Sequence, residues 1–138
     1  MLAKDHWYIA CPSLNLAERT PLAAQFGDLQ VVVFRGLNGE PHALLDRCCH
    51  RGVKLSRGRV SGNGCIACGY HGWEYDAKGN VRRIPSLGEG NLRSKFQIPS
   101  FPVRETHHYV WVWIPGASET PTYEPELRGF APGIQTQT

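Results

Sequence analysis

The sequence lacks any apolar run that approaches the roughly 18 residues of a membrane-crossing helix. Its first six residues contain no apolar core of a secretory signal, so we expect a cytoplasmic protein. The formal net charge of +3 is too small to indicate nucleic-acid binding. We therefore expect neither a membrane nor a nucleic acid among the partners.

Long helical patterns and internal repeats are also missing, whereas ten prolines and fifteen glycines favour many turns. This balance predicts an all-β chain with one compact domain over residues 1–118. Residues 119–138 are rich in Pro, Thr, Glu and Gly, and we expect a tail or linker there. Aromatic and β-branched runs predict strands at residues 7–10, 29–35, 42–46, 64–68, 73–76, 81–84, 101–105 and 109–114.

Five cysteines are an odd number, and a disulfide framework is not expected without a secretory signal. Two of them occur with histidines in short pairs, Cys48-x-His50 and Cys68-x-x-His71, with 17 residues between the pairs. Glycines flank both pairs and allow the backbone to pass close to a bound group. Cys48, His50, Cys68 and His71 are therefore the candidate metal ligands.

Two metals fit such a ligand set. Structural zinc sites usually group their cysteines in C-x₂₋₄-C knuckles. Here each loop mixes one cysteine with one histidine, which suits two irons, with both thiolates on one iron and both imidazoles on the other. We favour a [2Fe–2S] cluster; a zinc ion and a metal-free pair of loops are the alternatives.

The residues around these pairs resemble the cluster region of Rieske non-haem iron oxygenases. The family pattern is C-P-H-R-G-x-x-L-S-x-G followed by C-P-Y-H-G-W-x-Y-D, and residues 48–58 and 68–76 follow it except at Cys49 and Gly69, where proline is common. The similarity extends over residues 5–118, which correspond to the N-terminal domain of those enzymes. The resemblance implies a Rieske fold, meaning an antiparallel β-sandwich with a small cluster-binding subdomain of two loops, and one [2Fe–2S] cluster per chain.

The resemblance also implies a function in one-electron transfer. A ferredoxin or flavin reductase would donate the electron, and a mononuclear iron on a catalytic domain or subunit would receive it. The sequence has no pattern of two histidines and one carboxylate for such an iron, so we expect no complete catalytic site in this chain. A free-standing Rieske-type ferredoxin, acting as an electron carrier, is the alternative. Val53, Tyr70 and Trp73 replace residues typical of high-potential Rieske proteins, so we expect a low potential.

Three features beside the candidate ligands have competing interpretations. Cys65 and Cys68 form a C-x-x-C pair, for which a buried thiol at Cys65 is favoured over a redox dithiol. His107 and His108 are expected on a strand, facing opposite sides. The stretch from Arg47 to Trp73 has no acidic residue but carries five cations, which either form a solvated surface or attract an acidic electron donor. These cations are Arg47, Arg51, Lys54, Arg57 and Arg59.

Overall fold

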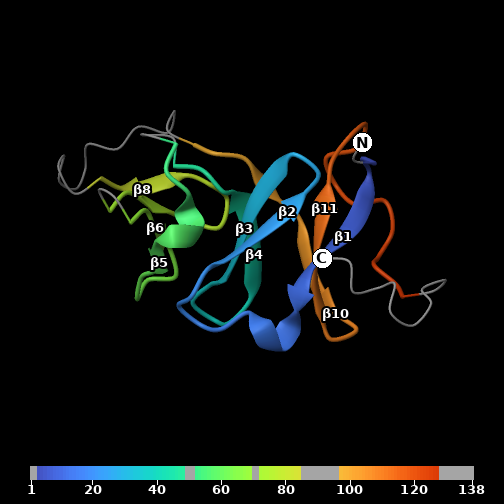
Figure 1. Cartoon of the computed structure of the whole chain (residues 1–138), viewed down its shortest axis with the longest axis horizontal. Coiled ribbons are helices and arrows are strands. Elements are labelled where there is room, and N and C mark those ends of the chain that lie inside the picture. The colour runs from blue at the N-terminus through green and yellow to red at the C-terminus, as the bar shows by residue number, and fades with distance from the viewer. Residues whose placement is uncertain (1–2, 49–51, 70–71, 85–96, 128–138) are drawn as a thin grey trace.

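The computed structural model describes residues 3–48, 52–69, 72–84 and 97–127 (Figure 1). Within these residues, regular structure consists of β strands and two single-turn 3₁₀ helices. In chain order the elements are β1 (His6–Pro12), η1 (Ser13–Asn15), β2 (Leu22–Phe26), β3 (Leu29–Arg35), β4 (Pro41–Leu45), η2 (Leu55–Arg57), β5 (Arg59–Val60), β6 (Ile66–Ala67), β7 (Glu74–Tyr75), β8 (Val81–Arg83), β9 (Ser100–Phe101), β10 (Val103–Thr106) and β11 (Tyr109–Ile114). In this part of the chain, no helix is long and apolar enough to cross a membrane.

The strands form three antiparallel sheets, which confirms the predicted all-β class. The terminal sheet has the order β1-β11-β10, the central sheet β2-β3-β4-β9, and the small sheet β5-β6-β7-β8. The central sheet lies between the other two (Figure 1). The small sheet and its loops thus form a separate layer at one end of the molecule.

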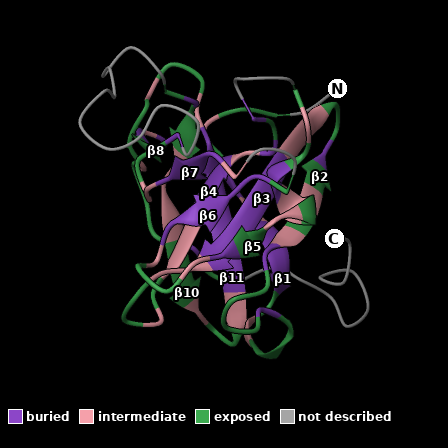
Figure 2. Cartoon of the chain, turned by 90° about the vertical axis from the view of Figure 1, so that its left-hand side faces the viewer, coloured by how far each residue is buried: buried purple, intermediate pink, exposed green. Residues whose placement is uncertain are grey.

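Strand β3 shows why the central sheet can carry a layer on each face. Successive side chains of a strand point to opposite faces. Val32 and Phe34 pack in the core shared with the small sheet, whereas Val31 and Val33 pack in the core shared with the terminal sheet. All four are fully buried. Burial on both faces explains the continuous apolar run in this strand, and Figure 2 shows the buried strands stacked through the centre.

A third apolar cluster lies on the outer face of the terminal sheet. It contains Trp7, Ile9, Trp111 and Trp113, with Leu127 packed against it. The chain after β11 therefore contacts this face instead of leaving it exposed.

Two local predictions differ from the structure. The sequence predicts no strand between residues 10 and 29, yet β2 forms there because it pairs with β3 from Leu22↔Val33 to Phe26↔Leu29. His107 and His108 lie in the turn between β10 and β11, not on a strand. Their φ angles of 57° and 71° match the left-handed turn that suits the twist of a tight hairpin.

Candidate functional site

The first candidate loop begins at Cys48, three residues after β4, and the Cys48 side chain is buried. The Cys48 N–H donates a hydrogen bond to the Val53 carbonyl at 2.7 Å, and the Gly52 N–H donates to the Cys48 carbonyl at 2.8 Å. Gly52 has a φ of +72°, in the left-handed region that glycine adopts without strain. These bonds bring Gly52 and Val53 back to Cys48, which closes the loop at its base.

The second candidate loop repeats this geometry at Cys68, which directly follows β6 and is also buried. The Cys68 N–H donates to the Trp73 carbonyl at 2.8 Å, and the Gly72 N–H donates to the Cys68 carbonyl at 3.0 Å. Gly72 has a φ of +73°. In both loops, therefore, a buried cysteine is followed four residues later by a left-handed glycine, and the same two backbone bonds close the turn.

Cys48 and Cys68 belong to one apolar cluster, so the structure brings the two predicted cysteines into the same core. The predicted ligands His50 and His71 fall inside the two closed turns by sequence but lie outside the described residues, as do Cys49, Arg51 and Tyr70. Among the residues that are described, no three His, Cys, Asp or Glu side chains gather as a metal site.

Asp46 fixes the first loop, and sequence reasoning did not identify this role. Its buried carboxylate accepts the Ser56 N–H at 2.7 Å through Oδ1 and the Ser56 hydroxyl at 2.6 Å through Oδ2. The Asp46 N–H in turn donates to the Gln30 carbonyl of β3 at 3.0 Å. The carboxylate thus ties the far end of the first loop to the central sheet, and Ser56 is the serine of the L-S-x-G motif.

Two glycines allow the loops to lie against each other. A Cβ atom at Gly58 would collide with the Ala67 carbonyl oxygen of β6, and a Cβ at Gly69 would lie 3.1 Å from the Arg57 carbonyl oxygen. The adjacent pairing of Arg59 with Ala67 continues this contact as the β5–β6 ladder. The end of the first loop is therefore packed directly on the start of the second.

Tyr75 links the two loops through its side chain. It lies on β7, just after the second loop, and its fully buried hydroxyl is 3.2 Å from the Sγ atom of Cys48 on the first loop. A thiolate can only accept, so the phenol donates when Cys48 is ionised as a metal ligand. Sequence reasoning missed this contact, although Tyr75 stands in the W-x-Y-D segment that carries the resemblance.

The remaining described cysteines are structural. Cys11 and Cys65 are buried and form no disulfide within the described chain. Burial raises the pKa of the Cys11 thiol to about 11 and also raises the pKa of Cys65. Both thiols therefore stay protonated near neutral pH, unlike the reactive thiolate of a redox dithiol.

The described part of the site fits a [2Fe–2S] cluster held by two thiolates and two imidazoles. Cys48 and Cys68 are buried together, each at the start of a closed turn. A hydroxyl is already directed at one sulfur. The sequence places one histidine within each turn.

Comparison with known proteins agrees with this geometry. The family model of the Rieske [2Fe-2S] domain matches residues 6–102. The vanillate O-demethylase oxygenase subunit of Pseudomonas sp. is 38% identical, with 86% of this chain and 32% of the relative covered. The chloroplastic chlorophyllide a oxygenase of Oryza sativa is 36% identical, with 90% and 22% covered.

Solved structures give the same result. The crystal structure of apo dicamba monooxygenase superposes with a TM-score of 0.79 at 32% identity, covering 91% of this chain and 38% of that chain. This chain thus spans only about two-fifths or less of the proteins it matches. The resemblance of the two cysteine loops to Rieske oxygenases is confirmed, and the chain belongs to the Rieske [2Fe-2S] domain family.

Proposed function

We propose that Cys48, His50, Cys68 and His71 bind one [2Fe–2S] cluster and that the chain transfers single electrons within a non-haem iron oxygenase system. A ferredoxin or flavin reductase supplies the electron, and a mononuclear iron site outside this chain receives it. The repeated closed turn at two buried cysteines carries the proposal, because it presents two thiols from one core. In the sequence, a histidine follows each cysteine within three residues.

When bound, a cluster of this type takes up and releases one electron at a time. The protein's own contribution lies in the surrounding groups. Cys48 and Cys68 supply the thiolates, and the Tyr75 hydroxyl donates to the Cys48 sulfur. Such a bond withdraws electron density from the sulfur and favours the reduced state. Asp46 and Ser56 keep the first loop closed.

The oxygenase assignment is supported by the relatives, several of which are named as oxygenases or their subunits. Their greater length leaves room for a catalytic iron domain, and this chain's sequence has no candidate ligand set for it. A cytoplasmic location is part of the same proposal and is tested by cell fractionation, because several relatives are chloroplastic.

Iron and acid-labile sulfide analysis tests the cluster directly. We expect two irons and two sulfides per chain, with a rhombic EPR signal after reduction by dithionite. Cys48→Ser and Cys68→Ser should each abolish the signal, because each variant removes a thiolate ligand. Cys65→Ser is the matched control and should retain it, since Cys65 is a buried thiol outside the ligand set. A single zinc ion per chain would contradict the proposal.

Electron acceptance by a mononuclear iron protein tests the oxygenase assignment. The reduced chain should bind an iron-loaded catalytic domain of a Rieske oxygenase and pass one electron to it per cluster. A reduced chain that instead reacts at equal rates with unrelated acceptors, and binds no such domain, would identify a free-standing carrier.

A further inference from the structure

The described cations in and beside the first loop share one feature, which is exposure without a bonded partner. Arg47, Lys54, Arg57 and Arg59 are all exposed, and in the part of the chain that the structure describes their side chains form no ion pair or hydrogen bond. The carboxylate nearest in sequence, that of Asp46, is buried and accepts two hydrogen bonds from Ser56. Among the described residues, no carboxylate therefore compensates their positive charge.

The arginines of β8 are different, although they belong to the same small sheet. The Arg82 Nε atom lies 3.2 Å from Asp76 Oδ2, and the Arg83 Nη1 atom lies 3.5 Å from Glu74 Oε2. Each of these cations thus has a carboxylate beside it. The cations at the two sides of the small sheet therefore differ in whether a carboxylate lies beside them.

Strand order separates the two groups in space. Arg59 lies on β5 and the paired arginines on β8, and these strands are the opposite edges of the sheet β5-β6-β7-β8. Three strand spacings separate the edges, or about 14 Å. Figure 2 shows β5 and β8 at opposite sides of this layer. The Arg57 backbone packs at Gly69, so the β5 edge also reaches the second loop.

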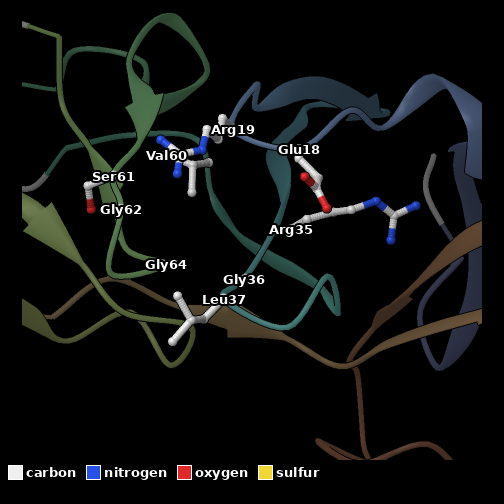
Figure 3. Close-up of a pocket in the computed structure, with 9 residues that line it drawn as sticks. All are labelled: Glu18, Arg19, Arg35, Gly36, Leu37, Val60, Ser61, Gly62 and Gly64. Atoms are coloured by element: carbon white, nitrogen blue, oxygen red, sulfur yellow. The ribbon is translucent and has the colours of Figure 1, made fainter.

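Arg19 extends the unpaired group. Its carbonyl accepts the Val60 N–H of β5 at 3.4 Å, and its side chain lies beside Val60 in the pocket of Figure 3. Glu18 is the acidic residue of this region, and it lies over Arg35, away from Val60 (Figure 3). We name the surface that Arg19, Arg57 and Arg59 form along β5 the cationic edge. Arg47 and Lys54 carry the same unpaired charge elsewhere along the first loop.

We infer that the cationic edge is the docking surface of an acidic electron-transfer protein, so that the electron enters from the side of the first loop and not from the side of β8. This inference rests on the proposed function. Unpaired exposed cations attract an acidic surface over a Debye length and orient it before contact, whereas ion-paired arginines largely cancel their own field. In the transfer, the reduced donor loses one electron and the oxidised protein gains it, with no bond formed or broken.

Two matched double variants test the docking surface. Arg57→Gln/Arg59→Gln and Arg82→Gln/Arg83→Gln remove the same formal charge from opposite edges of one sheet. The probe is an acidic plant-type [2Fe–2S] ferredoxin. Its affinity for the oxidised protein is measured by titration calorimetry, and its electron transfer is measured by stopped-flow absorbance at several salt concentrations.

We expect the Arg57/Arg59 variant to weaken binding by about tenfold at low salt and to flatten the salt dependence of the rate. The Arg82/Arg83 variant should stay within about twofold of the wild type, because its charges were already compensated. Equal weakening by both variants would show that only net charge matters and would overturn the inference. An unchanged Arg57/Arg59 variant would also overturn it.

Reduction by dithionite distinguishes a failure of the docking inference from a failure of the proposed function. Both variants should contain two irons per chain and should be fully reduced by dithionite. A wild-type protein that contains no cluster would refute the proposed function itself. If the cluster is present and reducible by dithionite, but both double variants bind ferredoxin equally well, only the docking surface is refuted.

Discussion

At the scale of single residues, the contact between Tyr75 and Cys48 places a hydroxyl beside the sulfur of a candidate ligand. The two residues are separated by 27 positions in sequence, yet their hydroxyl and sulfur atoms are 3.2 Å apart in a fully buried environment. The sequence predicts a low potential because Val53, Tyr70 and Trp73 replace residues typical of high-potential Rieske proteins, among them one serine that donates a hydrogen bond to a sulfide. The Tyr75 hydroxyl is a donor of this kind when Cys48 is ionised as a metal ligand.

Replacing Tyr75 with Phe removes this hydroxyl and keeps the ring. A net hydrogen bond of about 0.5–1.5 kcal/mol corresponds to a decrease of about 20–60 mV in a one-electron potential. Redox titration followed by EPR measures the shift. Tyr8→Phe is the control, because the Tyr8 hydroxyl bonds the Ala3 carbonyl far from the loops. A potential that is unchanged or higher in Tyr75→Phe would exclude the donor role.

At the scale of elements, the packing of one loop on the other depends on glycine at position 58. There is no space for a Cβ atom between the end of η2 and the Ala67 carbonyl. Because β5 and β6 pair immediately beside this contact, a shift of one loop must also strain the ladder. The separation of the two cysteines is therefore sensitive to this position.

Gly58→Ala should lower the free energy of unfolding by about 1–3 kcal/mol, as expected for overpacking against backbone. It should also reduce the cluster content of the purified protein, because the two loops are forced apart. Urea unfolding and iron analysis measure these effects. Gly62→Ala is the matched control: no atom lies within 4 Å of its Cβ position, so its stability should change by no more than about 0.5 kcal/mol. Equal stability of both variants would contradict the packing argument.

At the scale of the whole molecule, the two ends of the described chain lie on the same sheet. The Trp7 indole N–H donates to the Tyr123 carbonyl at 2.6 Å, and the Trp113 indole N–H donates to the Ser118 carbonyl at 3.1 Å. The Tyr123 ring stands edge-on to Trp113 at 5.5 Å. Residues 118–127 thus cover the tryptophan cluster, while the division into a domain and a tail at residue 118 stays a prediction.

Asp5 fixes the beginning of this segment. Its φ of 60° is left-handed, and its two carboxylate oxygens accept the N–H groups of Gly116, Ala117 and Ser118 at 2.9, 2.9 and 3.0 Å. These backbone hydrogen bonds, Ser118 first, hold the pKa of Asp5 below its usual value of 3.8. Folding therefore favours the ionised carboxylate.

Asp5→Asn should destabilise the protein at neutral pH, since asparagine tolerates the backbone conformation but supplies a single neutral acceptor oxygen. The stabilisation by Asp5 is complete above the usual pKa of 3.8 and is lost as the pH falls through the lower native pKa. The difference in unfolding free energy between wild type and variant should therefore shrink below about pH 4. Tryptophan fluorescence during urea unfolding at several pH values measures it. A difference that does not vary with pH would refute the charge argument. Asp28→Asn is the control, because Asp28 lies at an exposed position.

Much of the fold could be predicted from the sequence because its signals are local. Alternating and continuous apolar runs predicted β3, β4 and β11 within a residue or two, since these strands are long and well buried. Strand β2 was missed because residues 22–26 contain no β-branched side chain. It forms through pairing with β3 across the short turn at Gly27 and Asp28, a turn signal that was present in the sequence.

The sequence by itself determined the all-β class, the family and the four candidate ligands, because these depend on residue types at short spacings. Only the tertiary structure decided that Tyr75 reaches Cys48, that Asp46 closes the first loop, and which cations remain unpaired. Those contacts join residues that are distant in the sequence, and their distances are fixed by strand order and by the packing of three sheets. The energy of a hydrogen bond or an ion pair depends on the distance between its two atoms in space. The spacing of two residues along the chain does not give that distance.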